Sequence, residues 1–224
     1  MIKIINCKNK NYIKKLKFFL ENRRSGKVID TSIVPKIIKD IKKNKLKSLI
    51  KYEKKFSNNK KIQPTQREIN LSIKKLDPKI KKAIDFAYSR IFKFHSMQKI
   101  NNIKYIDQYK NKIEYKRVPI QKVGIYVPAN LPSTLLMNVI PAKIAGVKRI
   151  VVANPRVNGN LNPAVMYAAK KCNVKEIITC GGAQAIASLA YIQKVNKIVG
   201  PGNDYVARAK REVFGDVGIE GMIA

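Results

Sequence analysis

The sequence is poor in the residue types that build metal centres and nucleophilic sites. Its 224 residues include one histidine, three cysteines and no tryptophan. The lone histidine, His95, has no second histidine to complete a metal pair and belongs to no Ser-His-Asp arrangement, so packing or capping is its expected role. The cysteines Cys7, Cys172 and Cys180 are odd in number and lack CxxC spacing. These absences argue against a disulfide framework and against a zinc site built from cysteines.

Long apolar runs and the standard dinucleotide fingerprint are also missing. No apolar run reaches the ~18 residues needed to span a bilayer. The first residues contain no long apolar segment followed by a small-residue cleavage site, which is the mark of a signal peptide. We therefore expect a cytoplasmic protein with no membrane partner. The motif GxGxxG does not occur, so that motif cannot identify a nucleotide site in this chain.

Positive charge is the most prominent feature of the composition. The formal net charge is +33, and residues 1–117 hold 34 of the 47 basic residues. Lysine supplies 38 of these 47, whereas proteins that recognise nucleic acids usually favour arginine for bidentate contacts. Aromatic side chains are not interleaved with the lysines, as a platform for single-stranded nucleic acid requires. The composition therefore predicts a solvated lysine-rich surface and no specific nucleic-acid partner.

Helical patterns fill the first half of the chain. Apolar residues recur at helical spacing over residues 33–50, and the pattern resumes after an interruption at Asn44. Thr65 and Glu68 form a capping box in sequence, which predicts a short helix after them. The pair Asp77-Pro78 predicts a further helix start, and an apolar stripe extends that helix to about Met97. Residues 99–116 are polar and are expected to be irregular.

From about Val118 the charge density falls and strands alternate with helices. A helix capped by Ser133 or Thr134 is expected after the first strand, and Asn162 is expected to cap the next helix. The spacing suits βαβ units in one parallel sheet. We predict an α/β fold with an N-terminal helical segment, residues 1–122, followed by a Rossmann-like parallel-sheet domain, residues 123–224. The predicted strands begin at about residues 123, 149, 176 and 195.

Two glycine turns in the second half indicate a ligand-binding edge. Gly181-Gly182 and Gly200-Pro201-Gly202 each follow a short apolar strand and lead directly into a helical pattern. Strand, glycine turn and helix together direct backbone N–H groups at a ligand. Tyr126 ends the first strand, Gln184 falls in the first turn of a helix, and Asn203 occupies an N-cap position. A purely structural alternative exists for three of these features: a rim aromatic for Tyr126, a helix cap for Asn203, and a tight turn for the glycines.

Several long motifs, in order along the chain, closely resemble histidinol dehydrogenase. The resemblance extends upstream to about residue 20 and downstream to the last residue. The motifs that carry it are VGIYVP, PSTLLMNVIPAKIAGV, NPAV, GGAQAIASLAY, KIVGPGNDYVARAKREVFG and VGIEGMIA.

The resemblance implies an enzyme that oxidises L-histidinol to L-histidine in histidine biosynthesis. Members of that family work as cytoplasmic homodimers with NAD and zinc. The resemblance places NAD contacts on Tyr126, Gln184 and Asn203. Two segments near this edge are shorter than is usual in the family: PANLPST after YVP, and Ile192–Lys194 after LAY.

A third departure concerns the chemistry. In the family, the substrate-contacting segment, the zinc ligands and the acid/base pair follow the position at which this sequence ends. The resemblance therefore assigns no catalytic residue and no metal ligand to this chain. Compared with the family the chain looks truncated, and we expect it to be inactive alone. Two alternatives stay open: an NAD-binding remnant without catalysis, and a basic nucleic-acid-binding protein.

Overall fold

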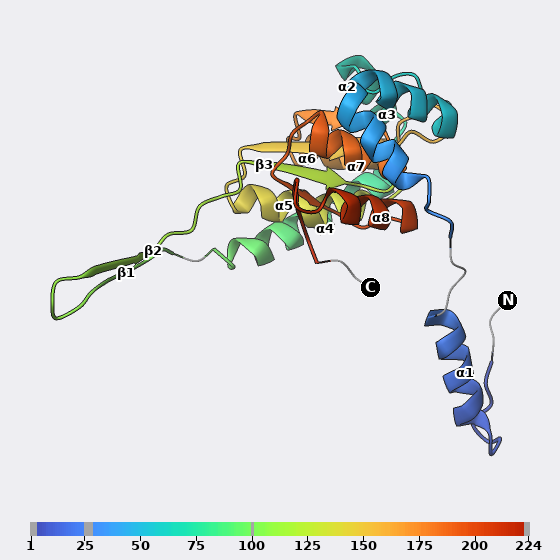
Figure 1. Cartoon of the computed structure of the whole chain (residues 1–224), viewed down its shortest axis with the longest axis horizontal. Helices are drawn as coiled ribbons and strands as arrows, with labels where there is room; N and C mark the ends of the chain where they lie inside the picture. The colour runs from blue at the N-terminus through green and yellow to red at the C-terminus, as the bar shows by residue number, and fades with distance from the viewer. Residues whose placement is uncertain (1–3, 25–28, 100, 222–224) are drawn as a thin grey trace. The chain divides into compact units, whose positions relative to one another are not determined.

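The computed structural model describes residues 4–24, 29–99 and 101–221, and it divides the chain into two compact units (Figure 1). The smaller unit ends at Thr31 and contains helix α1 (Tyr12–Arg24). The larger unit begins at Ser32 and contains all other helices and strands. The last three residues of the VGIEGMIA motif, 222–224, lie outside the described residues.

Three helices open the larger unit: α2 (Val34–Ser57), α3 (Gln66–Lys74) and α4 (Pro78–Ser96). The predicted interruption of the first pattern is confirmed, because Lys45 has a non-helical backbone with φ +49° that divides α2 into two parts. The capping box is confirmed as well: Thr65 Oγ1 accepts from the Glu68 N–H at 3.2 Å, and Glu68 accepts from the Thr65 N–H at 2.9 Å. Asp77 caps α4 by accepting from the Lys79 N–H at 2.7 Å.

A five-stranded parallel sheet forms the centre of the larger unit, so the predicted α/β class is confirmed. The strand order is β5-β4-β3-β6-β7, with β3 in the middle. The chain adds strands outward from β3 on one side and then crosses over to add β6 and β7 on the other. The strands are β3 (Lys122–Tyr126), β4 (Arg149–Ala153), β5 (Glu176–Ile178), β6 (Lys197–Val199) and β7 (Gly218–Ile219).

Helices cover both faces of this sheet and define two hydrophobic cores. One core joins α2, α7 and α8 to one face, and the other joins α4, α5 and α6 to the opposite face. Strand β4 shows the alternation: Val151 belongs to the first core and Val152 to the second, because successive strand residues face opposite ways. The connecting helices are α5 (Pro132–Ile144), α6 (Pro163–Lys171), α7 (Gly182–Tyr191) and α8 (Asp204–Val213).

The expectation that residues 99–116 are irregular is wrong. Strands β1 (Ile103–Ile106) and β2 (Lys112–Tyr115) pair as an antiparallel hairpin. The turn is built on Asp107, whose carboxylate accepts from the backbone N–H groups of Tyr109 and Asn111, each at 2.8 Å. The alternation of isoleucine and tyrosine with lysine and glutamate is the strand signal, and the many polar residues obscure it in the sequence.

The predicted cap of α5 is also wrong. Leu131 occupies the N-cap position and makes no side-chain cap hydrogen bond, and Pro132 follows at the first helical position. Proline has no N–H to satisfy there and its fixed φ suits a helix start, so the turn forms without Ser133 or Thr134 as a cap. Thr134 is instead a buried residue inside the helix. The cap predicted at Asn162 is confirmed by bonds from the N–H groups of residues 164 and 165.

The predicted domain boundary near Lys122 lies inside the larger unit. Buried side chains of α2 pack in one core with α7 and α8, so the helical segment and the sheet share their interior. The division at residues 122 and 123 stays a prediction. Among the described residues, no helix combines the length and the apolar character that crossing a membrane requires.

Candidate nucleotide-binding edge

The carboxyl ends of β3 and β6 meet at the point where the strand order changes direction. These neighbouring parallel strands pair through Ile125 and Val199, and β4 and β7 extend the sheet to either side. In doubly wound sheets, ligands bind in the crevice outside the carboxyl ends at this switch point. Tyr126 is the last residue of β3, and the two glycine turns follow β5 and β6, so all three lie at the carboxyl edge of the sheet.

The turn after β6 comes into direct backbone contact with β3. Gly200 has φ +111°, and a Cβ added there would lie 2.1 Å from the Tyr126 carbonyl oxygen. Only glycine fits this approach. Lys210, on the buried face of α8, donates from Nζ to the Gly200 carbonyl at 2.5 Å and also contacts Glu220. The Gly200 turn is therefore fixed from both sides.

Asn203 begins α8 directly after this turn. Its Oδ1 accepts from the Val206 N–H at 3.2 Å, so the predicted cap is confirmed. The residue itself is exposed at the carboxyl edge of the sheet. Helix capping and ligand contact are compatible at this position, since one oxygen caps the helix while the side chain faces solvent.

The turn after β5 is held by side chains beneath it. Gly182 has φ +56°, and its N–H donates to the Tyr126 hydroxyl at 3.4 Å. The Gly181 N–H donates to Oε1 of Glu53 at 2.9 Å. Gln184 is 4% exposed, and its Nε2 donates to the same carboxylate oxygen at 2.8 Å. The structure thus gathers Tyr126 and Gln184 around one glycine turn and places Asn203 at the other.

Burial controls the protonation of the groups around the first turn. Burial raises the pKa of Glu53, while hydrogen bonds from Gly181, Gln184 and Asn59 act in the opposite direction. Burial also raises the pKa of the Tyr126 hydroxyl, so the phenol is neutral at physiological pH. The Cys180 thiol is fully buried and its pKa is raised well above the ordinary value, which argues against a thiolate nucleophile there.

Zinc in proteins is held by three or four His, Cys, Asp or Glu side chains that converge on one point. Across residues 4–24, 29–99 and 101–221, no group of three or more His, Cys, Asp or Glu side chains is placed to hold a metal ion. His95 is bonded through Nδ1 to the side-chain oxygen of Gln98 at 2.6 Å and packs edge-on against Phe94. The side chains that the structure describes therefore do not fit a zinc centre.

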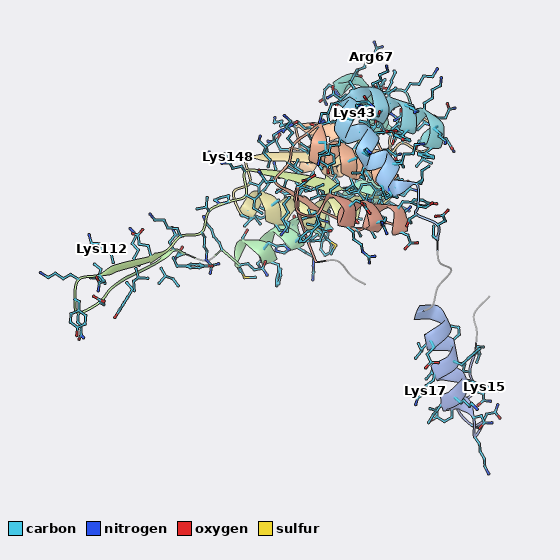
Figure 2. The ribbon with its side chains drawn as sticks, in the orientation of Figure 1. Lys15, Lys17, Lys43, Arg67, Lys112 and Lys148 are labelled. Carbon is cyan, nitrogen blue, oxygen red and sulfur yellow. The ribbon has the colours of Figure 1, made fainter. Side chains whose placement is uncertain are left out.

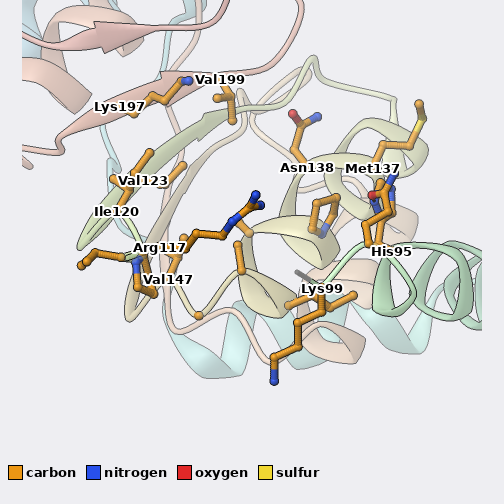
Figure 3. A pocket seen from close by; sticks show the side chains of 18 of the residues that line it. His95, Lys99, Arg117, Ile120, Val123, Met137, Asn138, Val147, Lys197 and Val199 are labelled. Atoms are coloured by element: carbon orange, nitrogen blue, oxygen red, sulfur yellow. The ribbon is translucent and has the colours of Figure 1, made fainter. Parts of the chain in front are cut away.

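An open groove of about 910 Å³ lies between the end of α4, the second half of α5, the segment before β3, and residues of β3 and β6. It meets the β3–β6 pair at Val199, the last residue of β6. Figure 3 shows His95, Met137 and Asn138 along one wall and Val123 and Lys197 along the other. The groove does not include any of the three residues predicted to contact NAD.

Two buried charged residues at the edge escaped the sequence analysis. Glu53 lies beyond the predicted end of its helix at residue 50, and Lys210 sits among the apolar positions of α8. Both are on helix faces that are otherwise buried, with relative exposures of 0% and 7%. A charged residue in register with an apolar helical stripe is the signal that identifies such positions.

Comparison with known proteins decides the family. The sequence profile described as histidinol dehydrogenase matches residues 21–224. The chain belongs to the histidinol dehydrogenase family. The family is one of oxidoreductases, and the resemblance carried by the sequence motifs is confirmed.

Individual relatives agree in identity and fold. A histidinol dehydrogenase of Pelagibacter ubique (strain HTCC1062) is 58% identical over 231 residues, which cover 100% of this chain and 54% of the relative. One of Caulobacter vibrioides is 38% identical, with 92% of this chain and 50% of the relative covered. The crystal structure of histidinol dehydrogenase from Elizabethkingia anophelis superimposes with a TM-score of 0.83 at 36% identity, over 89% of this chain and 49% of that one.

These coverages define which part of a histidinol dehydrogenase is present. The chain spans about half the length of the curated relatives it matches and corresponds to an N-terminal portion of them. The parallel sheet and its glycine edge lie within the matched region. The activity, substrate and assembly of the whole enzyme are therefore proposals for this chain.

Proposed function

We propose that this chain supplies the NAD-binding edge of a histidinol dehydrogenase, a cytoplasmic enzyme that oxidises L-histidinol to L-histidine. The observation that carries the proposal is the carboxyl edge of the parallel sheet, where one glycine turn follows β6 at the switch point beside β3 and a second follows β5. Folds of this class bind dinucleotides at that point. When bound, NAD would supply the hydride acceptor for the oxidation.

Three side chains are proposed to contact NAD: Tyr126, Gln184 and Asn203. Asn203 is exposed on the rim, where its amide can orient a polar group of the ligand. Tyr126 and Gln184 form the inner wall, with exposures of 6% and 4%, and shape the site more than they enter it. Gly200 permits the close approach of its turn to the end of β3.

This chain contributes neither zinc ligands nor the acid/base pair in the proposal. The described residues do not form a metal site, and His95 is bonded to Gln98 away from the glycine edge. L-Histidinol as the substrate, zinc as a second cofactor and a homodimeric assembly are proposed for the complete family enzyme. For the 224-residue chain alone we propose NAD contact without turnover.

Calorimetric titration of the chain with NAD tests the binding proposal. Asn203→Asp keeps a cap oxygen for α8 but loses the amide donor, whereas Asn203→Ala loses both. We expect the two variants to weaken NAD binding by a similar factor, about fivefold or more, which corresponds to one lost hydrogen bond. Only Asn203→Ala should also lower stability. Absence of NAD binding by the unmodified chain would overturn the proposal.

An activity assay separates NAD contact from catalysis. The chain is incubated with L-histidinol, NAD and zinc, and NADH formation is followed by the absorbance of the reduced nicotinamide ring. We expect no histidinol-dependent NADH, since the acid/base groups and metal ligands are proposed to lie in the remainder of the family enzyme. Clear turnover by the isolated chain would contradict this part of the proposal.

A further inference from the structure

Glu53 is a buried carboxylate that joins the N-terminal helices to the glycine edge. It lies near the end of α2, has no exposed surface, and is 128 residues from Gly181 in the sequence. Its Oε1 accepts from the Gly181 N–H at 2.9 Å and from Nε2 of Gln184 at 2.8 Å. Its Oε2 lies 3.5 Å from Nδ2 of Asn59. A carboxylate is retained in an interior only where donors replace its lost water, and two of these three donors belong to the turn after β5.

The bonds continue from Glu53 into the sheet. Asn59 donates from Nδ2 to the Thr179 carbonyl at 2.6 Å, and the Thr179 N–H donates to the Ile62 carbonyl at 2.6 Å. The segment that follows α2 is therefore bonded to the chain between β5 and the Gly181-Gly182 turn. The position of the turn depends on a helix outside the parallel-sheet segment, and Glu53 is the residue that contacts the turn directly.

We propose that Glu53 is a positioning residue, which fixes the Gly181-Gly182 turn and orients the Gln184 amide. Its carboxylate also occupies the N-terminus of α7, so that a phosphate does not bind there. The part of the inference that concerns NAD rests on the proposed function. The N-terminus of a helix carries partial positive charge and unpaired N–H groups that attract anions. Here a built-in anion meets that charge, so the ligand is expected to contact the α7 turn with a neutral group.

The neighbours of Glu53 support this assignment. Cys180 precedes the turn, and Tyr126 lies across it with its hydroxyl 3.4 Å from the Gly182 nitrogen. Burial raises the pKa of both the Cys180 thiol and the Tyr126 phenol, so both are neutral at physiological pH. Neither group adds charge to the turn. A phosphate placed at the same helix end would approach the Glu53 carboxylate with no cation in the turn to screen it.

Three variants of the full chain separate positioning from general stability. Glu53→Ala removes the acceptor, and Glu53→Gln keeps an acceptor oxygen of nearly the same size but removes the charge. Leu49→Ala is the control, because Leu49 is a 1% exposed core residue of the same helix and makes no bond to the turn. Amide hydrogen exchange and ¹H–¹⁵N chemical shifts of Gly181 are the readouts, with the amides of β4 as the internal reference.

We expect Glu53→Ala to accelerate Gly181 exchange at least tenfold relative to β4, Glu53→Gln to restore most of that protection, and Leu49→Ala to change both regions together. We also expect the Gly181 amide signal to move upfield in Glu53→Gln, because a charged acceptor is lost. Equal acceleration of Gly181 and β4 in Glu53→Ala, or failure of Glu53→Gln to rescue protection, would show a merely structural role and overturn the assignment.

Titration with inorganic pyrophosphate tests exclusion of the anion. The Gly181–Gln184 signals of the unmodified chain should stay in place, whereas those of Glu53→Gln should shift with added pyrophosphate. Equal shifts in the two proteins would overturn the exclusion. These measurements use no NAD. If the chain fails to bind NAD, the proposed function is overturned, but hydrogen exchange and chemical shifts still test the role of Glu53.

Discussion

Gly200 is the residue on which the candidate site depends most directly. Its backbone conformation lies in the left-handed region, and the space that a side chain would need is filled by the Tyr126 carbonyl at 2.1 Å. The sequence pattern placed this glycine at a strand end, and the structure supplies the reason that no other residue fits. Tyr126 and Gln184 were also found from their positions after strands, but their burial depends on Glu53 and α2, which lie far away in the sequence.

Gly200→Ala is expected to destabilise the protein by about 3 kcal/mol or more, because backbone strain and a clash with main-chain atoms both apply. Gly159→Ala is the matched control. Gly159 also has a positive φ, +76°, but no atom lies within 4 Å of an added Cβ, so conformational strain alone should cost about 1 kcal/mol. Urea denaturation followed by far-UV circular dichroism measures both. Similar losses in the two variants would contradict the close approach at Gly200.

At the scale of elements, β4 and β5 are joined by a charged pair at their amino ends. Arg149 donates from Nε to Glu176 at 2.7 Å and from one terminal nitrogen at 2.6 Å, and it also bonds the Gln193 carbonyl at 2.8 Å. The Arg149 guanidinium lowers the pKa of the Glu176 carboxyl. The pair therefore connects two strands and the segment that follows α7, on the side of the sheet opposite the candidate site.

The lowered pKa of Glu176 predicts how stability depends on pH. A carboxyl whose pKa is lower in the folded state stabilises the protein above its unfolded pKa of about 4.3, and this contribution disappears as pH falls through the folded value. Since both side chains are about one-third or more exposed, we expect only about 0.5 kcal/mol at pH 7. A double-mutant cycle with Arg149→Met and Glu176→Gln measures it. A coupling energy near pH 2.5 that equals the value at pH 7 would contradict the predicted loss of this contribution at low pH.

The β1–β2 hairpin is an element that polar composition concealed. Ile103 pairs with Tyr115 and Tyr105 with Ile113 on one face of the ribbon, and all four side chains are 57–59% exposed. A two-stranded hairpin is marginally stable in water without packing on one face. We expect its amides to exchange with solvent at least a hundredfold faster than those of β4, as judged by hydrogen exchange. Equal protection would show that this face is covered in solution.

At the scale of the whole molecule, the sequence predicted the fold class better than the packing. Helix caps and strand–turn–helix order depend on near neighbours, so Thr65, Asp77 and Asn203 are predicted correctly, whereas the cap of α5 is not, because a proline begins that helix. Residue 53 could not be assigned to the glycine edge, because its partner at Gly181 becomes a neighbour only when α2 packs on α7. The hairpin was missed because its side chains face solvent, which leaves the alternation without a buried partner to reveal it.

The charge of +33 is spread over many elements. Figure 2 labels basic side chains on α1, α2, α3, β2 and the approach to β4. We expect DNA binding by this chain to be weak and non-specific at low salt and to fall steeply between 50 and 200 mM salt. Fluorescence anisotropy with two unrelated duplexes measures this. A clear preference for one duplex at 200 mM salt would contradict a purely compositional charge.

The most direct test of the NAD-binding edge is a ¹H–¹⁵N NMR titration of the chain with NAD. We expect chemical shifts to change at Tyr126, at residues 181–184 and at residues 200–203, with little change in the groove near His95 and Met137. Such a result places the cofactor at the switch point between β3 and β6. Shifts confined to the groove, or no shifts at saturating NAD, would contradict the proposal that this half of histidinol dehydrogenase carries the NAD-binding edge.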